Sequence, residues 1–102
     1  MKLKWSNSVY KTDNVEKDKE FITDQLSWLN EHLKLFGYIF LNDVLWALGF
    51  KPCRRGQYDG WIWDSLDPNG QVPIKIKIKS ENGDLVVILN EEKDIVNQVF
   101  SE

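Results

Sequence analysis

The spacing of apolar residues indicates a long helix in the first third of the chain. Apolar side chains fall at Val15, Ile22, Leu26, Leu29, Leu33 and Phe36, and from Ile22 on the spacing is four, three, four and three. That is the period of one helical face. Thr12-Asp13-Asn14 supplies N-cap side chains before this segment, and Gly37 follows it in the place of a left-handed C′ residue. The pattern therefore predicts a helix that begins after Asn14 and ends at Gly37.

A second apolar ridge lies on the same helix. Phe21, Trp28 and Leu35 are spaced by seven, about 100–140° around the helix from the first stripe. One face of a helix cannot hold both ridges. Either the helix is buried on two sides, or the second ridge contacts a partner, and a second copy of the chain is one such partner.

Shorter segments follow the long helix. Tyr38 to Leu41 predicts a short strand, and Asn42 is placed to cap a short helix from Asp43 to Leu48 that Gly49 ends. The apolar face of this helix consists of Val44, Leu45 and Leu48. Trp46 points away from that face, so it is a candidate interface residue together with Phe21, Trp28 and Leu35.

The second half of the chain has the alternation and the turns of an antiparallel sheet. Residues 61–63 begin a strand, residues 72–79 alternate isoleucine or valine with polar positions, and residues 85–89 form the continuous apolar run of a central strand. Turns are predicted at Asp67-Pro68-Asn69-Gly70 and at Asn82-Gly83. For residues 94–100 we favour a last strand over a terminal helix.

Lys2-Leu3-Lys4-Trp5 also alternates and predicts a short, loosely placed extended segment at the N-terminus. Taken together, the elements predict an α+β fold in which one long and one short helix pack on a small antiparallel meander of three to four strands. The 102 residues are expected to form a single domain, residues 1–102.

The charge of the chain is unevenly distributed. The net charge is −3 and the pI is about 5.1, which disfavours a dedicated nucleic-acid-binding protein. Between Lys51 and Lys79, however, there are six basic and three acidic residues, a net charge of +3, so the rest of the chain carries −6. The single cysteine excludes an internal disulfide, and no segment has the length of a membrane span or the pattern of a signal peptide. We therefore expect a cytoplasmic protein.

Part of the chain resembles a known family. The run from Gly37 to Val44, followed by Leu48-Gly49, Gly56-Gln57 and Gly60-Trp61, is similar to a motif of short uncharacterised proteins from bacteriophages and integrative elements of Gram-positive bacteria. In that family F-L-N-D-V opens a short helix, L-G closes it and G-W begins the first strand. The chain departs from the family at Glu91-Glu92-Lys93, where Asp-Gly-like residues are expected. No activity is established for the family, so the resemblance implies a mobile-element context and assigns no catalytic residue.

Several chemistries lack their residues. One histidine and one cysteine, His32 and Cys53, exclude an ordinary zinc site and form no recognisable catalytic pair. The glycines do not have the spacing of a phosphate-binding loop. We expect no enzyme, no cofactor and no metal.

The candidate binding residues gather in the basic segment. They are Arg54, Arg55, Tyr58 and Trp61, extended by Lys75, Lys77 and Lys79 on one face of the predicted strand. Arginine and tyrosine are typical of binding hot spots, and arginine pairs with carboxylates and phosphates. The alternatives are a solvated loop, a core position for Trp61, and lysines that protect a sheet edge.

Three functions remain open at this stage, and the third, after the two that follow, is an enzyme of unrecognised type with a deep pocket of convergent carboxylates. The leading hypothesis is a small non-catalytic binding protein, a phage inhibitor or adaptor of a host protein such as a defence nuclease. The alternative is a nucleic-acid-binding accessory protein that uses residues 51–79.

Overall fold

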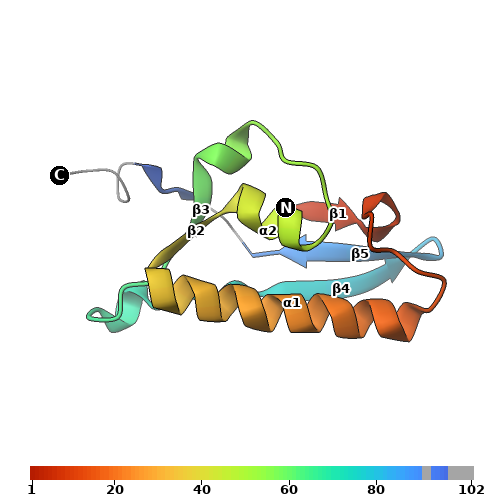
Figure 1. Cartoon of the computed structure of the whole chain (residues 1–102), viewed down its shortest axis with the longest axis horizontal. Helices are drawn as coiled ribbons and strands as arrows, with labels where there is room; N and C mark the ends of the chain where they lie inside the picture. The colour runs from red at the N-terminus through yellow and green to blue at the C-terminus, as the bar shows by residue number, and fades with distance from the viewer. Residues whose placement is uncertain (91–92, 97–102) are drawn as a thin grey trace.

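Two helices and two small antiparallel sheets make up the fold (Figure 1). The computed structural model describes residues 1–90 and 93–96. The long helix α1, Val15–Phe36, runs along the long axis of the molecule, and the short helix α2, Leu41–Ala47, lies above it in the view of Figure 1. The prediction of an α+β fold with one long and one short helix is confirmed.

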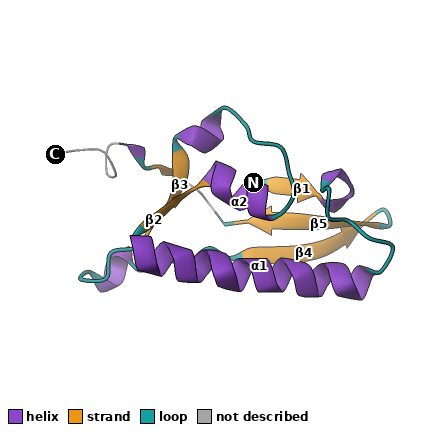
Figure 2. Cartoon of the chain, viewed as in Figure 1, coloured by secondary structure: helices purple, strands orange, loops and turns teal. Residues whose placement is uncertain are grey.

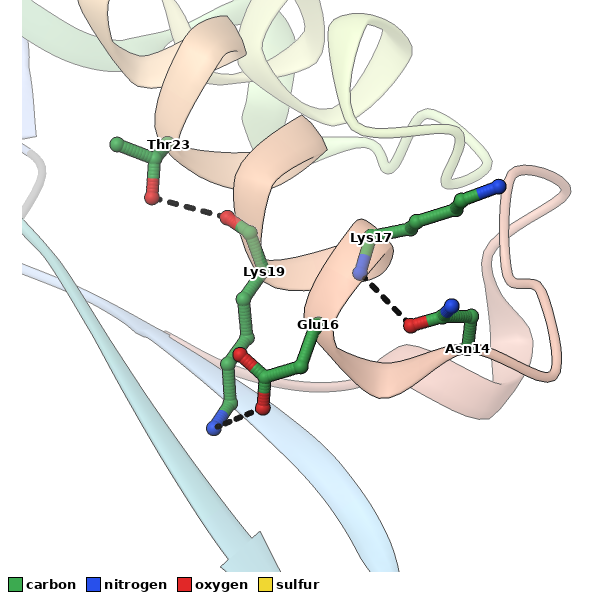
Figure 3. A network of polar contacts seen from close by, with 5 residues as sticks. All are labelled: Asn14, Glu16, Lys17, Lys19 and Thr23. Carbon is green, nitrogen blue, oxygen red and sulfur yellow. Dashed lines mark hydrogen bonds and ion pairs between the residues drawn. The ribbon is translucent and has the colours of Figure 1, made fainter.

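Both ends of α1 are capped by the residues that the sequence indicates. The side chain of Asn14 accepts a hydrogen bond from the backbone N–H of Lys17 at 3.1 Å (Figure 3). Within the first turns, Glu16 pairs with Lys19 at 3.8 Å, and Thr23 donates to the carbonyl oxygen of Lys19. Exposed ion pairs of this kind contribute at most about 0.5 kcal/mol, so the cap matters more than the pair. At the other end Gly37 has φ 84° and donates to Leu33 O at 2.8 Å.

The first sheet contains the N-terminal segment, which the sequence predicted only as loosely placed. Its strand order is β1-β5-β4, with β1 at Lys2–Lys4, β4 at Ile76–Glu81 and β5 at Asp84–Leu89 (Figure 2). The predicted extended segment is confirmed as β1, but its loose placement was wrong, because β1 pairs with β5 and leads directly into Trp5, which is only 1% exposed. The central position of β5 is confirmed.

The β4–β5 hairpin follows its turn signal. Asn82 and Gly83 have φ of 52° and 85°, as a type I′ turn requires at both central positions. The predicted strand 72–79 begins later, at Ile76, and Val72 is exposed rather than inward-facing. The segment before β4 is held instead by side chains: Asn30 accepts from Ile74 N at 2.8 Å and donates to Ile74 O at 2.9 Å.

The second sheet has the order β2-β3-β6, with β2 at Tyr38–Phe40, β3 at Asp59–Ile62 and β6 at Lys93–Asp94. The strands are thus divided between two three-stranded sheets rather than joined in one meander. The strand predicted for residues 94–100 overlaps β6 only at Asp94, and Val96 is helical, which disagrees with a strand at that residue. Residues 97–100 lie outside the described residues. The predicted turn at residues 67–70 is a short 3-10 turn, η3, Pro68–Gly70, in which Asp67 caps the N–H of Asn69.

The core lies between α1, α2 and the facing sides of the two sheets. It is built mainly from the large apolar residues of these elements: Trp5, Ile22, Leu29, Leu33, Ile39, Leu41, Val44, Leu45, Leu48, Trp61, Ile74, Val87 and Leu89. The first apolar stripe of α1 is therefore confirmed in its middle. Its two ends, Val15 and Phe36, are exposed because the helix extends beyond the core on both sides.

One buried carboxylate ties the N-terminal segment to α1. Asp18 accepts hydrogen bonds from Thr12 N at 3.1 Å and from Thr12 Oγ1 at 2.7 Å. Burial raises the pKa of Asp18, but the hydrogen bonds from Thr12 outweigh burial, and the pKa lies below its ordinary value. The Trp5 indole N–H also favours the charged form, although within the described residues it makes no hydrogen bond of ordinary geometry. The charged form of Asp18 is therefore the one that the fold stabilises.

We expect Asp18 to stabilise the fold at neutral pH. Because its folded-state pKa is lowered, its contribution is complete above the unfolded-state pKa of about 3.9 and is lost as the pH falls through the folded-state value. Asp18→Asn should lower the free energy of unfolding at pH 7 and flatten its decrease below about pH 4. Denaturant unfolding across this pH range checks the prediction, and an acid dependence identical to that of the wild type would contradict it.

Candidate binding surfaces

The residues of the family motif build a framework. The sequence predicted Asn42 as the N-cap of α2. This was wrong, because α2 begins at Leu41, so Asn42 lies inside the helix. Its side chain instead accepts from Cys53 N at 2.9 Å and donates to Cys53 O at 3.0 Å. These two bonds fix the loop after α2, and they place Cys53 half-buried against the core.

Two glycines of the motif are required by close approaches in this framework. A Cβ on Gly56 would lie 1.9 Å from Asn42 Oδ1, and a Cβ on Gly60 would lie 2.1 Å from Ile39 O in the neighbouring strand. Gly49 ends α2 with φ 85°. The motif residues therefore end α2 at Gly49, fix the loop after it through Asn42, and allow β2 and β3 to approach at Gly60.

The Asn42–Gly56 contact can be measured as a coupling. Asn42→Ala leaves the Cys53 backbone groups without their partner and should cost about 2–3 kcal/mol. Gly56→Ala should also destabilise, because the three atoms nearest to its new Cβ all belong to the Asn42 side chain. The double variant should then be less destabilised than the sum of the two. Denaturant unfolding of all three variants checks this, and strict additivity would contradict it.

An aromatic groove lies between α1, α2 and the N-terminal segment. It has a volume of about 380 Å³ and is lined by Tyr10, Phe21, Gln25, Trp28, Trp46 and Ala47. Phe21 is half-buried, with its ring centroid 5.0 Å from that of Tyr10 and 6.2 Å from that of Trp5. Trp28 and Trp46 are 55% and 72% exposed. The structure thus brings together three of the four residues predicted as an interface.

The fourth predicted interface residue extends the same side of α1 without lining the groove. Leu35 is exposed two turns beyond Trp28. Along this side of α1 the rings of Trp28, His32 and Phe36 contact one another in tilted pairs, with centroid distances of 5.6 and 4.5 Å. The lone histidine is therefore part of an aromatic row, which accounts for it without a catalytic role.

Carboxylates border the groove. Asp24 and Glu31 are exposed on α1 within about 60° of Trp28 around the helix axis, and Glu20 lies slightly further round. Asp43 is exposed on α2, one turn from Trp46. The groove is therefore an apolar surface with an acidic edge.

The predicted basic surface of residues 51–79 is divided by the fold. The 3-10 turn η2, Arg55–Gln57, lies at the top of Figure 1, while β4 lies beside α1 at the opposite side of the molecule. In the loop, Arg55 pairs with Asp59 at 2.7 Å and its guanidinium lies 5.5 Å from the Tyr58 ring centroid, and Arg54 is exposed. Trp61 is 4% exposed and belongs to the core, so it is not a contact residue.

Lys75, Lys77 and Lys79 are exposed, as the alternation predicted. They do not extend the loop of Arg54 and Arg55, as expected, but lie near lysines of β1. Lys2 and Lys4 of β1 lie on the same side of the first sheet. Lys2, Lys4 and Tyr10 are not among the contact residues that the sequence predicted. The alternation of residues 2–5 signalled a strand, but no local pattern identifies its partner.

Within residues 1–90 and 93–96, no group of three or more histidine, cysteine or acidic side chains is placed to hold a metal ion. None of the described helices is long and apolar enough to cross a membrane.

The fold and its surfaces define a small α+β protein with an aromatic groove. The model of one protein family, described as a family of unknown function (DUF6353), matches residues 3–97, so the chain belongs to that family. The prediction of an uncharacterised family is confirmed at that level, and the phage and mobile-element context stays a prediction. No curated protein and no solved structure matches the chain.

Proposed function

We propose that the protein is a non-catalytic binding protein that contacts another protein through the aromatic groove. The observation that carries the proposal is the pair Trp28 and Trp46, which two different helices expose at one groove. Tryptophan and tyrosine dominate the binding energy of protein interfaces. Large apolar side chains left on a surface beside a complete core are typical of an interaction site.

The acidic edge of the groove supports a partner with a basic surface. Asp24 and Glu31 lie on α1 near Trp28, and Asp43 lies on α2 near Trp46, so a partner with an apolar side chain flanked by lysines or arginines complements this edge. Basic surfaces of this kind are common on enzymes that act on nucleic acid. This supports the role of an inhibitor or adaptor of a host protein such as a defence nuclease, encoded by a phage or another mobile element.

Site-specific photo-cross-linking tests the proposal before the partner is known. A benzoylphenylalanine is placed at Trp46 and, in a second protein, at Leu66, an apolar residue that is 92% exposed outside the groove. In a Gram-positive host we expect one cross-linked protein from position 46 that is absent from position 66. The same products from both positions, or none from position 46, would contradict the proposal. A product with twice the mass of the chain would replace it with a homodimer.

A further inference from the structure

The register of the first sheet gathers five lysines on its outer side. Leu3, Val87 and Ile78 are in register across β1, β5 and β4, and all three contact the core. Their neighbours along each strand must point the other way. Lys2, Ile88 and Lys77 therefore form one row of the outer face, and Lys4, Val86 and Lys79 form the next. Lys75 continues this side two residues before Lys77. We call this surface the lysine face.

One exposed ion pair lies on the lysine face. Lys2 Nζ lies 2.9 Å from Glu81 Oε2, so the pair joins β1 to β4 across the central strand β5. In the register Val86 lies between the two, and it is only 3% exposed although it points away from the core. Among the described residues, the ammonium groups of Lys4, Lys75, Lys77 and Lys79 make no ion pair.

The lysine face concentrates positive charge on an acidic protein. The lysine face carries five lysines and two carboxylates, Glu81 and Asp84 at the hairpin end, so its net charge is +3. The remaining eight basic and fourteen acidic residues of the chain sum to −6. The net charge of −3 is therefore unevenly distributed over the surface. Local charge decides electrostatic contacts over distances near the Debye length of about 10 Å.

We propose that the lysine face binds the phosphate backbone of nucleic acid. The face contains lysine but neither arginine nor an aromatic residue. Protein interfaces are depleted in lysine and enriched in arginine and aromatic residues, whereas lysine is a common partner of phosphate oxygens. Lysines two residues apart on a strand are spaced by roughly 6.7 Å, so the face offers an extended row of charges. Without base-reading side chains, the binding is independent of sequence.

The test measures fluorescence anisotropy of a labelled oligothymidine and a labelled duplex, each about 20 nucleotides long, as salt is varied. With four lysines engaged, log affinity should fall with log salt with a slope of about −3 for the single strand. Lys77→Glu with Lys79→Glu should weaken binding at low salt at least tenfold. The matched control is Lys51→Glu with Arg54→Glu, which changes the net charge by the same amount in the loop after α2, away from the lysine face. This variant should retain most of the affinity.

Three outcomes would overturn the proposal. One is no binding of either probe at low salt, which leaves the lysines as protection of the sheet edges. Another is an equal loss in the control variant, which attributes the effect to net charge. The third is tighter binding of poly-L-glutamate than of either oligonucleotide, which assigns the face to an acidic protein. Lys77→Gln with Lys79→Gln, together with circular dichroism, separates charge from folding and should give an intermediate loss.

Discussion

Replacing Gly60 with alanine is expected to destabilise the fold by about 3 kcal/mol or more. The new Cβ would lie 2.1 Å from Ile39 O and 2.9 Å from Phe40 Cα, both backbone atoms of β2. Gly60 is paired in register with Phe40, so relief of the clash requires β2 and β3 to separate. Since β3 also pairs with β6 at this residue, the change affects the whole second sheet. Denaturant unfolding measures the loss directly.

Gly83→Ala is the matched control for this prediction. Gly83 also needs its conformation, with φ 85°, but a Cβ there would meet no atom within 4 Å. Its cost should therefore be limited to backbone strain, about 1–2 kcal/mol. Equal losses in the two variants would show that the close approach of β2 and β3 is not the reason for Gly60.

The elements predicted correctly are those whose signals are local. Asn14 and Gly37 cap the two ends of α1, Asn82-Gly83 forms the hairpin turn, and the continuous apolar run of β5 marks the central strand. Each of these signals determines the structure of residues that are close to it in the sequence. The candidate groove was also partly visible, since the seven-residue spacing of Phe21, Trp28 and Leu35 separates them from the core stripe.

The remaining features depend on contacts between distant segments. The pairing of Lys2 with Ile88 creates the lysine face, and no local pattern encodes it. Asn42 is a residue type that often caps helices, but its side chain forms hydrogen bonds with the backbone of Cys53, eleven residues away, instead. For the same reason the basic segment 51–79 looked continuous in the sequence while the fold separates its two halves.

Trp46→Ala is expected to weaken partner binding by at least about thirtyfold, which corresponds to about 2 kcal/mol at a hot spot. Trp46 is 72% exposed, so its removal leaves no cavity in the core. The free energy of unfolding should therefore change by no more than about 0.5 kcal/mol. Trp28→Ala should act in the same direction, because both rings line the same groove.

The most direct test is a calorimetric titration of the partner identified by cross-linking, with Trp46→Ala and Leu66→Ala measured beside the wild type. We predict a loss of at least about thirtyfold for Trp46→Ala and affinity within about twofold of wild type for Leu66→Ala. Wild-type affinity in Trp46→Ala, or an equal loss in both variants, would contradict the assignment of the aromatic groove as the site of protein binding.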